Sequence, residues 1–114
     1  MRKQIIEQTA LEVAHQVRAV EDSIETALLE LAELQGRMLR ARSIAGVGIS
    51  TGHEALEQLA VSLQALVQAR GGMANCHAAL LDATQKVPGL RTIGFGDVQE
   101  CPEPGASLHL RAVA

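Results

Sequence analysis

A single stripe of aliphatic residues along the first third of the chain constrains its fold more than any other feature. The stripe begins at Ile6 and steps four and three residues in alternation, without a miss, as far as Ala41. A period of about 3.5 residues is typical of a helix face that buries against other helices. No proline interrupts the stretch, and its one glycine is Gly36. The members are Ile6, Ala10, Val13, Val17, Val20, Ile24, Ala27, Leu31, Leu34, Met38 and Ala41.

The length of this stripe argues against an ordinary globule. A helix over residues 3–43 is roughly 60 Å long at about 1.5 Å per residue. A compact domain of this size has a radius of gyration of about 13 Å, so the helix needs a partner to cover it. Further apolar residues widen the stripe beyond a two-stranded seam and favour a bundle of three or four helices. These are Leu11, Leu28, Ala32 and Leu39.

The pattern therefore predicts an all-α fold, a long antiparallel helical hairpin of two coiled-coil-like helices that forms a four-helix bundle by dimerisation. Glycines at 46, 48 and 52 permit the reversal between the helices. Thr51 and Glu54 fit a capping box that opens the second helix. The expected ranges are 1–87 for the hairpin, with helices over 3–43 and 52–87 around a loop over 44–51, and 88–114 for a C-terminal tail.

The sequence pattern of the tail differs from that of the helical hairpin. Its Leu108 and Leu110 belong to a stretch in which apolar and polar residues alternate, as in a strand. Two strands alone are marginal in water. We therefore expect the tail to be either extended or a β-hairpin that packs against the bundle.

The second helix carries a stripe whose phase changes. Leucines at 56, 59, 63 and 66 continue the spacing of three and four, and the same register would place Arg70 and His77 inward. The aliphatic stripe resumes instead with a different phase, next to Gly71 and Gly72, where helix propensity is lowest. We expect a break there, as a kink or a register shift. The resumed stripe comprises Ala69, Met73, Cys76, Leu80, Ala83 and Val87, and makes Cys76 a small buried hydrophobe.

The composition excludes several functional classes. The chain has 114 residues, a formal net charge of −3, and neither Trp nor Tyr. It therefore lacks the basic surface and the stacking platforms that nucleic-acid binders use. No apolar run approaches the roughly 18 residues of a membrane span. Cys76 and Cys101 have no disulfide-framework spacing, so we expect a cytoplasmic protein without metal or cofactor.

His15 is a candidate phosphate carrier. The string Leu11-Glu12-Val13-Ala14-His15-Gln16-Val17-Arg18 resembles the helix that bears the phospho-accepting histidine in the dimerisation domain of histidine kinases. The resemblance implies that His15 is the phospho-acceptor of a dimeric hairpin. No ATP-binding domain follows, so the chain would carry phosphate passively.

Glu12 and His15 also form a Glu-x-x-His pair, the spacing with which helical bundles hold two metal ions. A hairpin that turns near residue 47 brings Asp82 level with Glu12, so a dimer would offer two copies of each ligand. The stripe, however, places Glu12 and His15 on its solvent side, which favours a solvated helix face over a metal site.

The function that the pattern favours is protein–protein interaction. We expect a homo-oligomer, with a dimer favoured, that acts as an adaptor and binds a second protein. No arrangement of catalytic residues is recognisable, so we do not expect an enzyme. Val47 and Ile49 in the loop, and Leu108 and Leu110 in the tail, are the expected contacts with the second protein. The residues expected to mediate self-association are Val13, Val17, Val20, Ile24, Leu31, Leu34, Leu59, Leu63 and Leu66.

Overall fold

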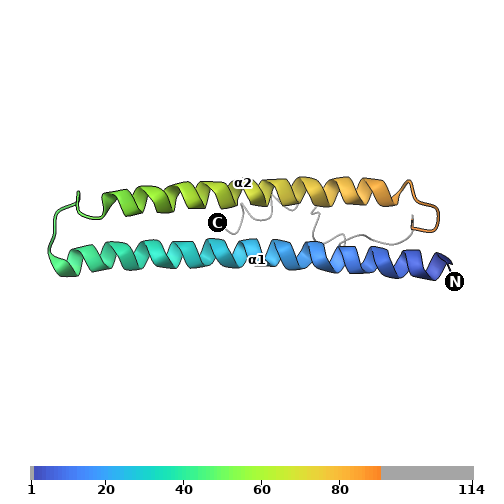
Figure 1. Cartoon of the computed structure of the whole chain (residues 1–114), viewed down its shortest axis with the longest axis horizontal. Coiled ribbons are helices and arrows are strands. Elements are labelled where there is room, and N and C mark those ends of the chain that lie inside the picture. Colours follow the sequence, from blue (N-terminus) through green and yellow to red (C-terminus); the bar gives the residue numbers. More distant parts are fainter. Residues whose placement is uncertain (1, 91–114) are drawn as a thin grey trace, which may run out of the picture. The chain divides into compact units, whose positions relative to one another are not determined.

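The computed structural model describes residues 2–90, and in this range all regular secondary structure is helical. Two long helices follow one another, α1 (Arg2–Ala45) and α2 (His53–Thr84), with a short loop between them (Figure 1). For residues 2–90, the expectation of two long helices is confirmed. The greater part of the expected tail, including Leu108 and Leu110, lies outside the described residues.

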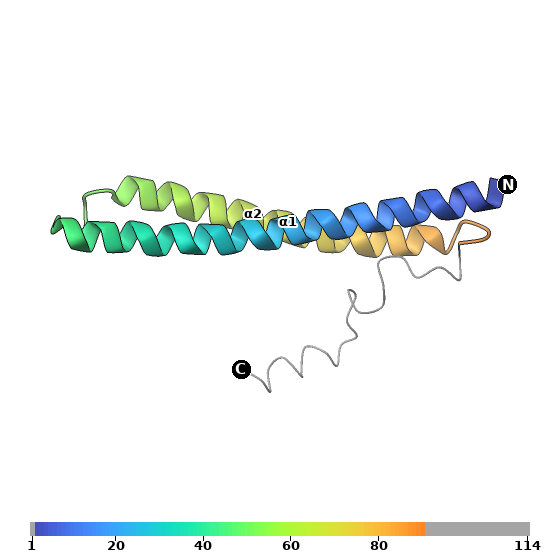
Figure 2. The same cartoon turned by 90° about the horizontal axis from the view of Figure 1, so that it is seen from below.

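The described residues gather into two compact units, and each unit contains a stretch of both helices. The loop unit comprises residues 20–73, where the second part of α1 and the first part of α2 run side by side in opposite directions (Figures 1 and 2). The terminal unit comprises residues 2–19 and 74–90 and pairs the start of α1 with the end of α2. Each unit is thus an antiparallel pair of helices.

Glycines shape the loop between the helices. Gly46 ends α1 with a positive φ of 68°, and its N–H donates to the carbonyls of Arg42 at 3.1 Å and Ser43 at 3.2 Å. This is the usual way in which a glycine just beyond a helix satisfies its last carbonyls. Gly52, with φ of 81°, opens α2, because its carbonyl accepts the first helical bond from the Leu56 N–H at 3.2 Å. Gly52 rather than Thr51 is therefore the N-cap residue.

The second helix ends at Thr84, three residues before the expected boundary. The Thr84 hydroxyl donates to the Leu81 carbonyl at 2.7 Å. The N–H groups of Gln85, Lys86 and Val87 then donate to carbonyls three residues earlier, at 3.0–3.3 Å. Bonds of this spacing tighten the chain into turns beyond the helix, and Pro88 follows directly.

The helix runs uninterrupted through Gly71 and Gly72, so α2 does not end at the expected break. Ending a helix leaves up to about four N–H or four C=O groups without partners at each new end. Two helical glycines cost only about 1 kcal/mol each relative to alanine, so the continuous helix is the cheaper arrangement.

The expected register shift is also wrong. The covered residues of α2 keep one heptad register on both sides of the glycines, so the polar residues at 77 and 84 face inward. His77 is 2% exposed, whereas Cys76 is exposed and is not a buried hydrophobe. The members of this register are Leu56, Leu59, Leu66, Met73, His77, Leu80 and Thr84 in α2, with Val87 just beyond its end, and Leu81 beside Leu80 is also half-buried.

The aliphatic stripe of α1 divides between the helix–helix contact and the surface. In the terminal unit Ala14 and Val17 are buried, whereas Val13 is exposed. In the loop unit Leu31 is half-buried, whereas Leu34 remains 47% exposed. The stripe is wider than one neighbouring helix can cover. One edge of it is therefore left open in a single copy of the chain.

Candidate interaction surface

The described part of the chain buries little of its apolar surface. Four apolar residues between positions 2 and 90 are buried, namely Ala14, Val17, Leu59 and Leu90. Twelve large apolar residues are exposed, and scattered single ones would be ordinary for a soluble protein. Their arrangement on the helices decides whether they form a surface. They are Ile5, Leu11, Val13, Leu29, Leu34, Leu39, Ile44, Val47, Ile49, Val61, Leu63 and Val67.

The residues expected to mediate self-association fall into three groups in the structure. Val17 and Leu59 are buried between the two helices of their own units. Val13, Leu34 and Leu63 are exposed and available to a partner. The remaining four, Val20, Ile24, Leu31 and Leu66, are half-buried.

On one side of the helix–helix contact in the loop unit, an ion pair joins the two helices. Arg70 on α2 donates from its Nε to Oε1 of Glu25 on α1. The same side, by helical register, carries a small hollow of about 290 Å³ whose lining includes Gln35 and Ala60. A partner that covered this side would have to remove an ion pair from water, which carries a desolvation cost.

The opposite side of the loop unit carries a row of residues without charge, and Glu30 and Arg37 lie at the edge of this row on α1. On α1, Val20, Ala27, Leu34 and Ala41 recur every seven residues, on the other side of the contact from Glu25. On α2, Ala55, Ser62 and Ala69 recur with the same spacing, on the other side from Ala60. We call these seven residues the uncharged face. Leu34 is its largest exposed member.

Gly72 lies beside the uncharged face, one helical turn from Ala69. A Cβ atom built on Gly71 or Gly72 would meet nothing within 4 Å. Neither glycine is among those with positive φ. No contact within the described residues therefore requires a glycine at either position, although each weakens the helix.

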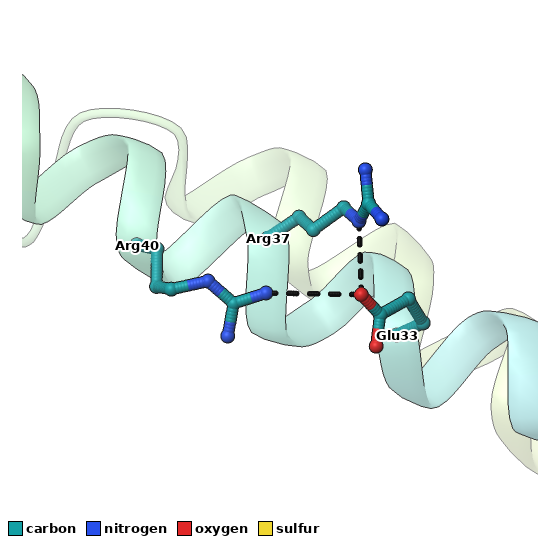
Figure 3. Close-up of polar contacts among 3 residues, drawn as sticks. All are labelled: Glu33, Arg37 and Arg40. Atoms are coloured by element: carbon teal, nitrogen blue, oxygen red, sulfur yellow. Dashed lines mark hydrogen bonds and ion pairs between the residues drawn. The ribbon is translucent and has the colours of Figure 1, made fainter.

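Charged groups near the end of α1 pair with one another on the helix surface. Arg37 donates from Nε to Glu33 Oε1 at 2.9 Å, and Arg40 Nη2 lies 3.8 Å from the same oxygen (Figure 3). All three side chains are mostly exposed. Exposed pairs of this kind contribute about 0–1 kcal/mol. They indicate a solvated surface rather than a binding site.

Residues 2–90 contain no assembled site for the metal-binding hypothesis or for the phosphate-carrier hypothesis. Glu12 and His15 are exposed on α1, where Gln8 Nε2 donates to Glu12 Oε1 at 3.4 Å. Asp82 is exposed on α2 and pairs with Lys86 at 3.4 Å. In residues 2–90 no group of three or more His, Cys, Asp or Glu side chains could hold a metal ion. His15 is accessible to solvent, as a phospho-acceptor must be, and so are many surface side chains.

Val47 and Ile49, the expected contacts with a second protein, are both exposed in the loop. The residue that sequence reasoning misplaced most clearly is His77, which is buried in the terminal unit. An uninterrupted heptad count from Leu56 would have placed it inward. The aliphatic residues of α2 also offer a second phase, which leaves His77 outside the stripe.

Neither described helix is long and apolar enough to cross a membrane. No family model matches the chain, and it matches neither a curated protein nor a solved structure.

Proposed function

We propose that the chain is a self-associating helical-hairpin module, in which two copies pair through the uncharged face and complete a four-helix bundle. The bundle then serves as an adaptor that binds a second protein. The observation that carries the proposal is the row of seven residues without charge on one side of the loop unit, in which Leu34 is 47% exposed.

The energetics favour a helical partner on this side. Full burial of a leucine or valine is worth roughly 1.5–3 kcal/mol, so covering the open part of Leu34 alone contributes about 1 kcal/mol. Val20 and Ala27 extend the same row, and none of the seven residues brings a charge that must leave water. Interfaces between copies of one chain are depleted of charge at their centres in the same way.

Small residues on α2 support a close approach of the second copy. Ala69 lies on the uncharged face, and Gly72 lies next to it with open space where a side chain would be. Small side chains let helix axes approach one another closely. A second copy would give these residues, and Gly72 in particular, a structural role that the single chain does not supply.

Substituting one exposed leucine tests the proposal. Leu34→Glu places a carboxylate at the centre of the uncharged face, and we expect size-exclusion chromatography to show a shift from dimer to monomer. Leu29→Glu is the matched control, because Leu29 is on the same helix, is 71% exposed and lies outside the face. We expect this control to remain dimeric.

Circular dichroism of both variants establishes that the helices persist. If Leu34→Glu is as dimeric as Leu29→Glu at equal concentration, the uncharged face is not the interface. If the unsubstituted chain is itself monomeric at micromolar concentration, the proposal is overturned altogether.

A further inference from the structure

A hollow at the loop end of the loop unit is a separate feature from the pairing of two copies. Its volume is about 480 Å³, and it shares only Ala41 and Ala55 with the uncharged face. The walls come from the last turns of α1, the loop and the first turn of α2, at the end where the two helices are joined in Figure 1. The large apolar residues of the lining are Met38, Leu39, Val47, Ile49 and Leu56.

Hydrogen bonds hold the loop wall of the hollow in place. Arg42 donates from Nη1 to the Val47 carbonyl at 3.0 Å, which ties the end of α1 to the loop. The Thr51 N–H donates to the Gly48 carbonyl at 3.1 Å and closes a turn in front of α2. The apolar wall is therefore organised before any ligand arrives, as in most small-molecule sites.

The charge around the hollow is positive. Arg42 and His53 are the ionisable residues that line it, and no carboxylate does within the described chain. His53 Nε2 lies 3.0 Å from Glu57 Oε1, so its charge, when present, is already compensated. The Arg42 guanidinium has five N–H donors, and one of them suffices for the Val47 carbonyl. The N-terminal end of α2 adds the positive end of a helix dipole.

We propose that the hollow binds an amphiphilic monocarboxylate, with the aliphatic chain against the apolar wall and the carboxylate on Arg42. The volume falls within the range of about 300–1,000 Å³ that is usual for small-molecule sites. An apolar body matches the lining, and a single anion matches the guanidinium, which recognises planar carboxylates well. A cationic amphiphile of equal length would face Arg42 and the α2 dipole and is disfavoured.

Calorimetric titration of the full-length protein tests this inference. The probe is decanoate, used below its micelle concentration, with decanol as the neutral analogue and decyltrimethylammonium as the cationic one. We expect saturable binding of one decanoate per chain and binding at least about tenfold weaker for both analogues, because a charge-assisted hydrogen bond is lost. Amide chemical-shift changes should be confined to the loop and the adjoining helix turns.

Two pairs of variants locate the site. Arg42→Gln should weaken decanoate binding at least about tenfold more than decanol binding, because it removes the partner of the carboxylate as well as the bond to the Val47 carbonyl. Arg40 does not line the hollow, so Arg40→Gln should alter neither affinity. Ile49→Ser removes part of the wall and should weaken both probes. Ile44→Ser is its control, since Ile44 is 87% exposed and lies outside the lining.

Absence of saturable decanoate binding overturns the inference. So does equal affinity for decanoate and decyltrimethylammonium, or a shift pattern centred on the uncharged face. These outcomes do not touch the self-association proposal, because the mass of the Leu34→Glu variant is measured without any ligand.

Discussion

The contribution of a leucine side chain to the stability of this protein depends on the side of the helix on which it lies. Leu59 is buried against α1 in the loop unit, whereas Leu29 points to solvent. Truncating a buried leucine removes its transfer free energy and leaves a cavity, which together cost about 2–5 kcal/mol. Truncating an exposed leucine removes little transfer free energy and leaves no cavity.

We therefore predict that Leu59→Ala lowers the free energy of unfolding by about 2–5 kcal/mol. Leu29→Ala should change it by no more than about 0.5 kcal/mol. Urea denaturation followed by circular dichroism, at one fixed protein concentration, measures both. Equal effects of the two substitutions would mean that the helices do not pack as described.

At this scale, sequence reasoning placed Val17 and Leu59 in the apolar stripes, and both are buried, but it was wrong about His77. It excluded Arg70 and His77 from the contact between the helices because aliphatic side chains were preferred there. Arg70 is exposed, although its guanidinium pairs with Glu25 on α1, whereas His77 is buried. Which polar groups find a partner across a helix pair depends on the opposite helix, and a single helical pattern does not contain that information.

Gly71 and Gly72 are the weak point of α2 as an element. Each costs about 1 kcal/mol of helix stability relative to alanine, and a Cβ at either site would meet nothing within the chain. The two differ in the side on which they lie, because Gly72 is beside Ala69 and Gly71 is turned away from the uncharged face.

The prediction at this scale uses that difference. Gly71→Ala should raise the free energy of unfolding by up to about 1 kcal/mol and leave the dimer intact. Gly72→Ala should stabilise the helix by the same amount but weaken association of the two copies, since its methyl group occupies space that a second copy approaches. Thermal unfolding and sedimentation velocity read out the two effects. Identical association in both variants would contradict a close approach at Gly72.

Most of the element boundaries could be read from the sequence. The helical period and the absence of proline located α1, and the glycines located the loop. The end of α2 could not be read in the same way, because Val87 continues the aliphatic stripe while the backbone has already tightened into turns after Thr84. The loop hollow was also missed, because its walls come from three segments that only the folded loop brings together.

At the scale of the whole molecule, the account depends on what covers the open edge of α1. Within the loop unit the two helices cover each other on one side and leave Leu34 of the uncharged face exposed. In a two-fold symmetric dimer, the uncharged face of one copy packs against the same face of the other. This arrangement closes the assembly without leaving another face open. Association of this kind also makes apparent stability depend on protein concentration.

The most direct test is the mass of the unsubstituted chain in solution, measured by multi-angle light scattering over a range of concentrations. The account predicts a particle of 24.2 kDa, twice the 12.1 kDa of one chain, that dissociates only on dilution. A folded particle of 12.1 kDa at every concentration would contradict it.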